Sequence, residues 1–153
     1  MPQNIFVKIS GDLIDNEQAV RWIAEHSKNT SMVVCVGGGT DINNALVDAG
    51  IPMRKHGPLG REHQSEAERA IADEVLAKNV IKTKSLFKER AIDSEVIAPI
   101  INIGGIMCHV NGDQMILAAY LGFDQLFVLT TVDRVTKKEA EFANYAKVKV
   151  VGF

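Results

Sequence analysis

Several features that would indicate particular classes of protein are missing from this sequence. Its 17 basic and 19 acidic residues are interspersed and give a formal net charge of −2, so no basic face suggests nucleic acid and no charged tail suggests a membrane surface. No apolar run approaches the length of a membrane span, and the start of the chain lacks a basic region followed by an apolar segment. We therefore expect a cytoplasmic protein without nucleic acid or membrane partners.

Cysteine is also scarce. The two cysteines, Cys35 and Cys108, lie far apart in apolar runs typical of strands, without CxxC spacing or a cluster of histidines. We expect both to be reduced thiols in the core, and we expect neither a disulfide nor a metal site.

The chain has the length and composition of one domain over residues 1–153. Its hydrophobic content of 46% is enough for a sizeable core. Apolar runs of strand length alternate with helical patterns, which predicts a mostly parallel α/β sandwich. The expected strands are 5–9, 33–36, 96–103, 126–130 and 148–151. The strand 96–103 is expected to be buried, in two parts around Pro99, and to end in a hairpin-like turn at Gly104 and Gly105.

Helical spacing and end signals predict the helices between these strands. A cap at Asp15 or Asn16 begins the first of them, and Gly50 ends a helix over 41–49. Further helices are expected from a capping box at 65–68 to about residue 79, at 113–121, and from a second capping box at 136–139. The helix 113–121 is expected to be strongly buried, Leu121 included. Residues 80–90 are mixed and basic, and no element is predicted for them.

The apolar run 33–36 leads into Gly37, Gly38 and Gly39 and then into a helix. Glycines let the backbone approach a ligand, and the free N–H groups of a helix start favour an anion. A second turn at Gly11 follows the strand 5–9, and ligands of open α/β sheets bind at the carboxyl ends of the strands. We expect the two turns to lie side by side, although a βα turn can need glycine for geometry alone.

Two cations near these turns need an explanation. Lys8 lies inside a strand, so it either reaches water from an edge strand or points at the anion site beside Gly11 and Gly38. Arg61 follows two glycines and is a candidate clamp for a carboxylate, which a guanidinium binds at two points. Arg54 and Lys55, in the same loop, are expected to be solvated.

Five motifs occur in the order found in the amino acid kinase family: 8–11, 36–39, 96–100, 110–113 and 129–133. The chain resembles this family over about residues 5–62 and 94–135, and acetylglutamate kinases most of all. The resemblance implies a three-layer α/β/α sandwich with a mostly parallel sheet. It also implies phosphorylation of a carboxylate or another oxyanion by ATP through charge neutralisation and positioning, without a covalent intermediate.

The resemblance also implies roles for single residues. Lys8 and Asp113 are the expected catalytic residues, with Lys8 holding the phosphoryl oxygens and Asp113 orienting that lysine. The expected phosphate-binding residues are Lys8, Gly11, Gly38 and Gly39, and the expected substrate-binding residues are Gly39, Arg61, His109 and Asn111.

The chain departs from the family pattern in several places. Ser10 and Arg134 replace family glycines, and His109 stands where the family has one of two asparagines. The stretch between Arg61 and Val96 is short, and most of the family's nucleotide-binding half, with its second lysine, is missing after residue 135. Lys137 or Lys138 could replace that lysine, but both lie in the second capping-box helix, where the simpler expectation is that they are solvated.

Three hypotheses remain open. The favoured one is a binding or regulatory protein that keeps a site for a small anionic or amino-acid ligand, has little kinase activity of its own, and forms a homo-oligomer. The second is a compact phosphotransferase. Only under this hypothesis would the protein require ATP with Mg²⁺ as cofactor. The third is a structural subunit of an oligomer.

Overall fold

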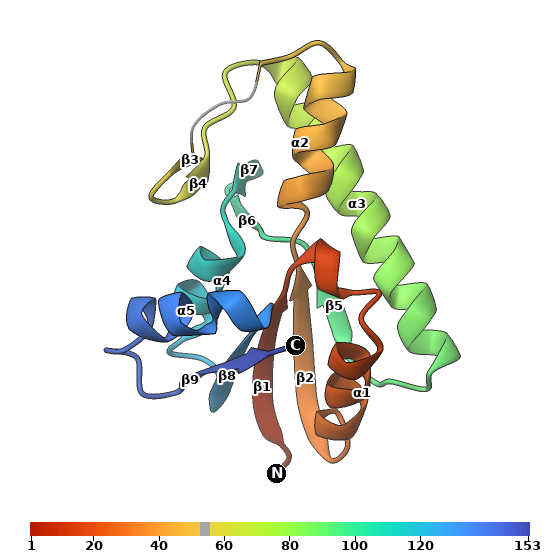
Figure 1. Ribbon diagram of the computed structural model, residues 1–153, viewed down its shortest axis with the longest axis vertical. Helices are drawn as coiled ribbons and strands as arrows, with labels where there is room; N and C mark the ends of the chain where they lie inside the picture. Colours follow the sequence, from red (N-terminus) through yellow and green to blue (C-terminus); the bar gives the residue numbers. More distant parts are fainter. Residues whose placement is uncertain (53–55) are drawn as a thin grey trace.

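The fold is built on a parallel sheet with the strand order β5-β2-β1-β8-β9. A computed structural model describes residues 1–52 and 56–153. The strands of the sheet are β1 (Gln3–Ile9), β2 (Thr30–Val36), β5 (Glu95–Ile97), β8 (Gln125–Thr130) and β9 (Val148–Gly152). Helices flank this sheet in a three-layer α/β/α arrangement, as expected (Figure 1). Arg54 and Lys55, expected to be solvated, lie outside the described residues.

The remaining elements connect these strands. The helices are α1 (Glu17–His26), α2 (Gly39–Asp48), α3 (Glu66–Glu89), α4 (Gly112–Ala119) and α5 (Val135–Glu141), with short 3-10 turns η1 (Gly11–Leu13) and η2 (Val132–Arg134). Two antiparallel hairpins complete the fold, β3 (His56–Gly57) with β4 (Gly60–Arg61), and β6 (Ile100–Ile103) with β7 (Ile106–His109). Figure 1 shows α2 and both hairpins beyond the carboxyl ends of β1 and β2, at the top of the view.

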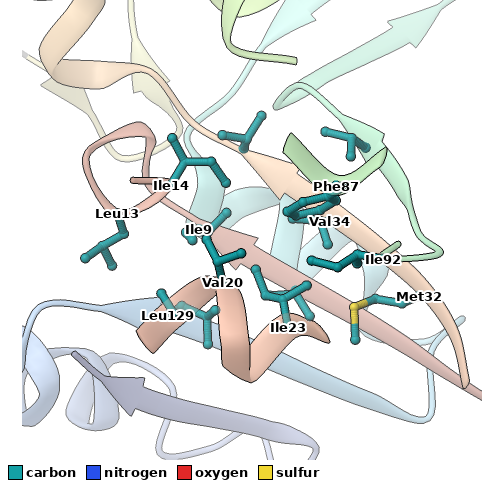
Figure 2. Packing of buried hydrophobic residues seen from close by; sticks show 14 of the residues in the cluster. Ile9, Leu13, Ile14, Val20, Ile23, Met32, Val34, Phe87, Ile92 and Leu129 are labelled. Carbon is teal, nitrogen blue, oxygen red and sulfur yellow. The ribbon is translucent and has the colours of Figure 1, made fainter. Parts of the chain in front are cut away.

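Alternation along the central strand β1 divides the core between the two faces of the sheet. Ile5, Val7 and Ile9 face α1 and the end of α3, where Figure 2 shows Val20 and Ile23 packed on the strands. Phe6 belongs to the other cluster, which includes Met115 and Ile116 of α4. Because side chains alternate, Lys8 shares its face with Phe6 and points to the side of α4.

The helix α3 is longer than the sequence pattern indicates. It was expected to end near Asn79, but it continues to Glu89 through the stretch for which no element was predicted. Its first half packs on α2 through Ala72 and Leu76, and its last turns pack on the sheet through Phe87. Because the two halves have different neighbours, their apolar residues do not form one regular stripe, and the periodicity is lost.

Three other expectations from the sequence are wrong. The second part of the strand 96–103 is not buried: it forms the β6–β7 hairpin, where Ile103 is 64% exposed. Cys108 lies on this hairpin and is partly exposed, while Cys35 is in the core, where burial raises its thiol pKa to about 12. Leu121, expected to be buried in α4, is 93% exposed beyond the end of that helix.

The turns and caps follow the sequence more closely. Gly104 and Gly105 make the hairpin turn with φ of 59° and 90°, in the left-handed region that glycine adopts readily. Asn16 caps α1 by accepting from the N–H groups of Gln18 and Ala19. The second capping box is absent, because α5 begins at Val135 with Arg134 at its N-cap. Across the described ranges, no helix combines the length and the apolar character that crossing a bilayer requires.

Candidate functional site

The two glycine turns touch each other at the carboxyl end of the sheet. The parallel pairing of β1 with β2 brings Lys8 opposite Cys35 and Ile9 opposite Val36. The Gly37 N–H then donates to the Ile9 carbonyl at 2.9 Å, and a Cβ on Gly11 would lie 2.8 Å from the Gly37 oxygen. The expected adjacency is confirmed, and Gly11 is needed because the two backbones approach so closely.

The turn at Gly37, Gly38 and Gly39 is held in place by Asn79 of α3. Its side-chain amide donates to the Gly37 carbonyl and to Asp41 Oδ2, both at 3.2 Å. A Cβ on Gly38 would lie 2.9 Å from Asn79 Nδ2, so only glycine leaves room for this support. Gly38 is also the N-cap of α2 and has no side chain to occupy the first-turn N–H groups. The sequence offered no signal for Asn79 beyond its place in a helix.

Lys8 and Lys138 both approach the carboxylate of Asp113 in the first turn of α4. The Lys8 Nζ lies 3.7 Å from Asp113 Oδ1, and the Lys138 Nζ lies 2.5 Å from Asp113 Oδ2 and 3.0 Å from Glu141 Oε2. Lys138 is only 7% exposed, so the expectation that it is solvated is wrong. Lys138 lies three residues after Val135 and four before Phe142, so the three side chains share one side of α5, the side that faces the core.

Gly112 makes room for the side chain of Lys8. A Cβ at Gly112 would lie 2.4 Å from the Lys8 Cε and 2.9 Å from its Cγ. Glycine at this position therefore lets the lysine stem pass over the start of α4.

The three charged groups of this cluster shift one another's pKa. Burial lowers the pKa of Lys8, and the attraction of Asp113 offsets this only in part. Burial also acts to lower the pKa of Lys138, but the hydrogen bonds to Asp113 and Glu141 outweigh it and raise that pKa. For Asp113, burial acts to raise the pKa, yet the two lysines hold it below its usual value.

The β3–β4 hairpin attaches to the start of α4. The Asn111 N–H donates to the Leu59 carbonyl at 2.9 Å, and Gly60, with φ of 137°, has no space for a Cβ beside the Asn111 nitrogen. Arg61 Nη2 donates to Asn43 Oδ1 of α2. Asn111 Oδ1 accepts from the Gln114 N–H at 2.8 Å, so the side-chain oxygen of this expected substrate-binding residue already caps α4.

Two histidines line the cavity together with Arg61. The His109 Nε2 lies 2.5 Å from Asp73 Oδ1 of α3, and the His63 ring packs edge-on against His109 with centroids 5.3 Å apart. Arg61 Nη1 and His63 Nδ1 are both buried without a hydrogen-bond partner among residues 1–52 and 56–153. Each such unmade hydrogen bond costs about 1–3 kcal/mol. His63 was not singled out from the sequence, where it is an isolated histidine.

All eight expected site residues line one cavity of about 310 Å³. They are Lys8, Gly11, Gly38, Gly39, Arg61, His109, Asn111 and Asp113. The lining also includes residues that sequence reasoning did not place there: Asp12, Asp41, His56, His63, Arg134 and Lys138. In the part of the chain that the structure describes, no three His, Cys, Asp or Glu side chains are grouped to hold a metal ion.

Comparison with known proteins informs the fold alone. No protein-family model matches the chain, and the comparison with curated proteins finds no match. Among solved structures, the chain is similar to smu.665 from Streptococcus mutans UA159, with a TM-score of 0.61 and 16% sequence identity. The match covers 94% of this chain and 84% of that one. It shows a shared three-layer α/β/α architecture.

Proposed function

We propose that this chain binds a small anionic or amino-acid ligand in the cavity, and that it has a binding or regulatory role with little kinase activity of its own. The observation that carries the proposal is that Lys8, at the cavity wall, is only partly compensated by Asp113, which lies 3.7 Å away and also pairs with Lys138. Arg134 adds a further cation to the lining. A bound anion would supply the negative charge that this part of the wall needs.

Backbone groups support the same proposal. The first turns of α2 and α4 both line the cavity, and helix N-termini favour anions through their N–H groups and the helix dipole. We assign phosphate or carboxylate oxygens to Lys8, Gly11, Gly38 and Gly39, and the rest of the ligand to Arg61, His109 and Asn111. The resemblance to amino acid kinases supports these roles. Asp12 and Asp41 in the lining suit the ammonium group of an amino acid.

Calorimetric titration with inorganic phosphate tests the proposal. We expect Lys8→Ala to weaken phosphate binding tenfold or more, because a hydrogen bond to a charged group contributes about 1.5–3 kcal/mol. Lys78→Ala is the matched control, since this lysine of α3 is 72% exposed and pairs with Glu74. Failure of the wild type to bind phosphate, or unchanged binding by Lys8→Ala, contradicts the proposal.

A second candidate is a compact phosphotransferase that uses ATP with Mg²⁺ and a carboxylate acceptor. The specific observation in its favour is Lys138, which places a second lysine on Asp113. Lys8 and Lys138 would neutralise charge on the phosphoryl oxygens, Asp113 would position both lysines, and Arg61 would hold the acceptor.

An ATP turnover assay with N-acetylglutamate distinguishes the two candidates. If the binding or regulatory proposal is right, we expect little turnover. Robust turnover that is lost in both Lys8→Ala and Asp113→Asn would establish the phosphotransferase. Loss of one charge-stabilising donor typically costs about 100-fold or more in rate.

We further propose that the chain forms a homo-oligomer in the cytoplasm, where its cysteines stay reduced. Ile103 and Ile106 are 64% and 69% exposed at the tip of the β6–β7 hairpin, and such apolar groups favour burial against another subunit. This surface would also serve a purely structural subunit. Sedimentation equilibrium tests the proposal, and a single species of 16.7 kDa contradicts it.

A further inference from the structure

The terminal amine of Lys8 has one long contact with the rest of the protein. The Lys8 side chain lines the cavity and is 14% exposed. Among the described residues it forms one ion pair, with Asp113 Oδ1 at 3.7 Å, which is longer than a hydrogen bond. Lys138, by contrast, donates to Asp113 Oδ2 at 2.5 Å and to Glu141 Oε2 at 3.0 Å. The amine of Lys8 is therefore available to a ligand, whereas that of Lys138 is occupied.

The groups around Lys8 favour its uncharged amine. Burial lowers its pKa, and the cations Lys138 of α5 and Arg134 of η2 act in the same direction. Asp113 of α4 and Cys35 of β2 oppose them. A lysine that is desolvated and lies near other cations is activated as a nucleophile toward carbonyl groups. Lys8 can therefore supply an amine as well as a cation.

The cavity beside Lys8 suits a small molecule with an anionic group. Its volume of about 310 Å³ is at the lower end of the range of small-molecule sites. The first turns of α2 and α4 line it and favour an anion. The absence of a Cβ at Gly112, which would lie 2.4 Å from the Lys8 Cε, lets the lysine stem pass over the start of α4. The amine and the helix N-termini therefore belong to the same cavity.

We propose that Lys8 is a site of reversible imine formation, which takes a small aldehyde or ketone that also carries an anionic group. The inference rests on the proposed function for the anionic group, which the glycine turns and the helix N-termini bind. Lys8 then bonds to the carbonyl carbon of the ligand and does not pair with its anion.

The reaction balances without a further reactant. The Lys8 ammonium releases a proton to solvent, and the amine attacks the carbonyl carbon, so that an N–C bond forms. The carbonyl oxygen takes a proton from this nitrogen and becomes a hydroxyl group. Uptake of one proton from solvent then lets the C–O bond break, and water leaves behind an iminium ion.

Asp113 suits the product of this reaction as well as the starting lysine. One proton is released and one is taken up, so the nitrogen carries one positive charge before and after the reaction. Asp113 Oδ1 is buried without a hydrogen-bond partner within the described ranges and is the oxygen that faces Lys8. The two lysines hold the pKa of Asp113 below its usual value, so its carboxylate stays ionised and compensates the iminium.

Reductive trapping with pyridoxal 5′-phosphate tests the inference. After treatment of the wild type at neutral pH with this aldehyde and sodium borohydride, peptide mass spectrometry locates the modified lysines. We expect Lys8 to be labelled at least about tenfold faster than Lys78, which is 72% exposed, because the cavity holds the aldehyde beside the amine. Lys138 lines the same cavity and should stay unlabelled, since two carboxylates occupy its amine.

A second aldehyde and two variants complete the test. Pyridoxal, which lacks the phosphate, should label Lys8 about tenfold more slowly than pyridoxal 5′-phosphate. Lys8→Arg should lose the label without gaining one at Lys138, and Lys78→Ala should keep the label on Lys8. The comparison of Lys8 with Lys138 in the wild type depends on no variant.

The outcomes separate this inference from the proposed function. Labelling of Lys8 no faster than that of Lys78, equal labelling of Lys138, or equal rates with the two aldehydes overturns the inference while calorimetry still shows phosphate binding. Failure of the wild type to bind phosphate overturns the proposed function instead.

Discussion

Lys8 and Lys138 approach the carboxylate of Asp113 from two regions of the molecule, and their surroundings shift their pKa values in opposite directions. Lys8 comes from β1 and lies 3.7 Å from Asp113, and burial lowers its pKa. Lys138 comes from α5 and donates to Asp113 at 2.5 Å and to Glu141 at 3.0 Å, and its pKa is raised although it too is buried. At Lys138 the hydrogen bonds to two carboxylates therefore outweigh burial, whereas at Lys8 burial outweighs the attraction of Asp113.

The difference separates the roles that we propose for the two lysines. Two carboxylates already satisfy Lys138, so this lysine mainly holds Asp113 in place. Lys8 carries a charge that its surroundings compensate only in part, and a bound anion would complete that compensation. The proposed function therefore depends on Lys8 for binding and on Lys138 for the position of the groups around it.

The largest expected effect is on stability, and it compares the two lysines directly. Lys138→Met removes the donor shared by Asp113 and Glu141, and breaking such a buried pair costs about 3 kcal/mol of unfolding free energy. Lys8→Met removes a poorly compensated charge and should change the unfolding free energy by less than about 1 kcal/mol. Urea unfolding followed by Trp22 fluorescence measures both values.

A neighbouring lysine provides the control for this comparison. Lys137 is 70% exposed and lies 3.9 Å from Glu141, so Lys137→Met should change the unfolding free energy by less than about 0.5 kcal/mol. Similar losses for Lys8→Met and Lys138→Met would contradict the distinction between the two lysines.

The next effect tests whether the position of Lys8, and not only its charge, determines binding. In Gly112→Ala the new methyl group would meet the Lys8 side chain at 2.4 Å and displace it. We expect phosphate binding to weaken about tenfold, and urea unfolding checks that the variant keeps its fold. Gly122→Ala is the matched control, with its nearest neighbour, the Ala119 oxygen, at 3.9 Å. Unchanged phosphate binding by Gly112→Ala would show that Lys8 adapts freely.

The region around Lys8 could be predicted because the sequence signals that mark it are local. Apolar runs followed by glycines mark strand ends, and parallel pairing then brings those ends to the same edge of the sheet. The adjacency of Gly11 and Gly37 follows from that pairing alone. The acidic first turn of α4, which carries Asp113, is also a local signal.

The region around Lys138 could not be predicted, because its geometry depends on long-range packing. The sequence does not show whether Lys137 or Lys138 faces the core. The packing of Phe142 against the sheet turns Lys138 inward. Long-range packing also explains why the second half of α3 was not predicted, since the two halves of this helix pack on different elements. It also explains His63, whose neighbours come from distant parts of the chain.

The smallest expected effect is a pH dependence that differs between the two lysines. The folded pKa of Lys8 lies below the unfolded value of 10.5, so the unfolded state binds more protons and stability rises with pH through the interval between the two values. The folded pKa of Lys138 lies above 10.5, so its stabilisation is present below that pH and is lost as the pH rises through the folded pKa.

We therefore expect the unfolding free energy of the wild type to increase relative to that of Lys8→Met between pH 7 and pH 10, as measured by urea midpoints. Saturating phosphate should reduce this increase, because a bound anion raises the pKa of Lys8 toward its unfolded value. Parallel pH profiles for the wild type and Lys8→Met would mean that Asp113 compensates Lys8 as fully as it does Lys138, and the need for an anion at Lys8 would disappear.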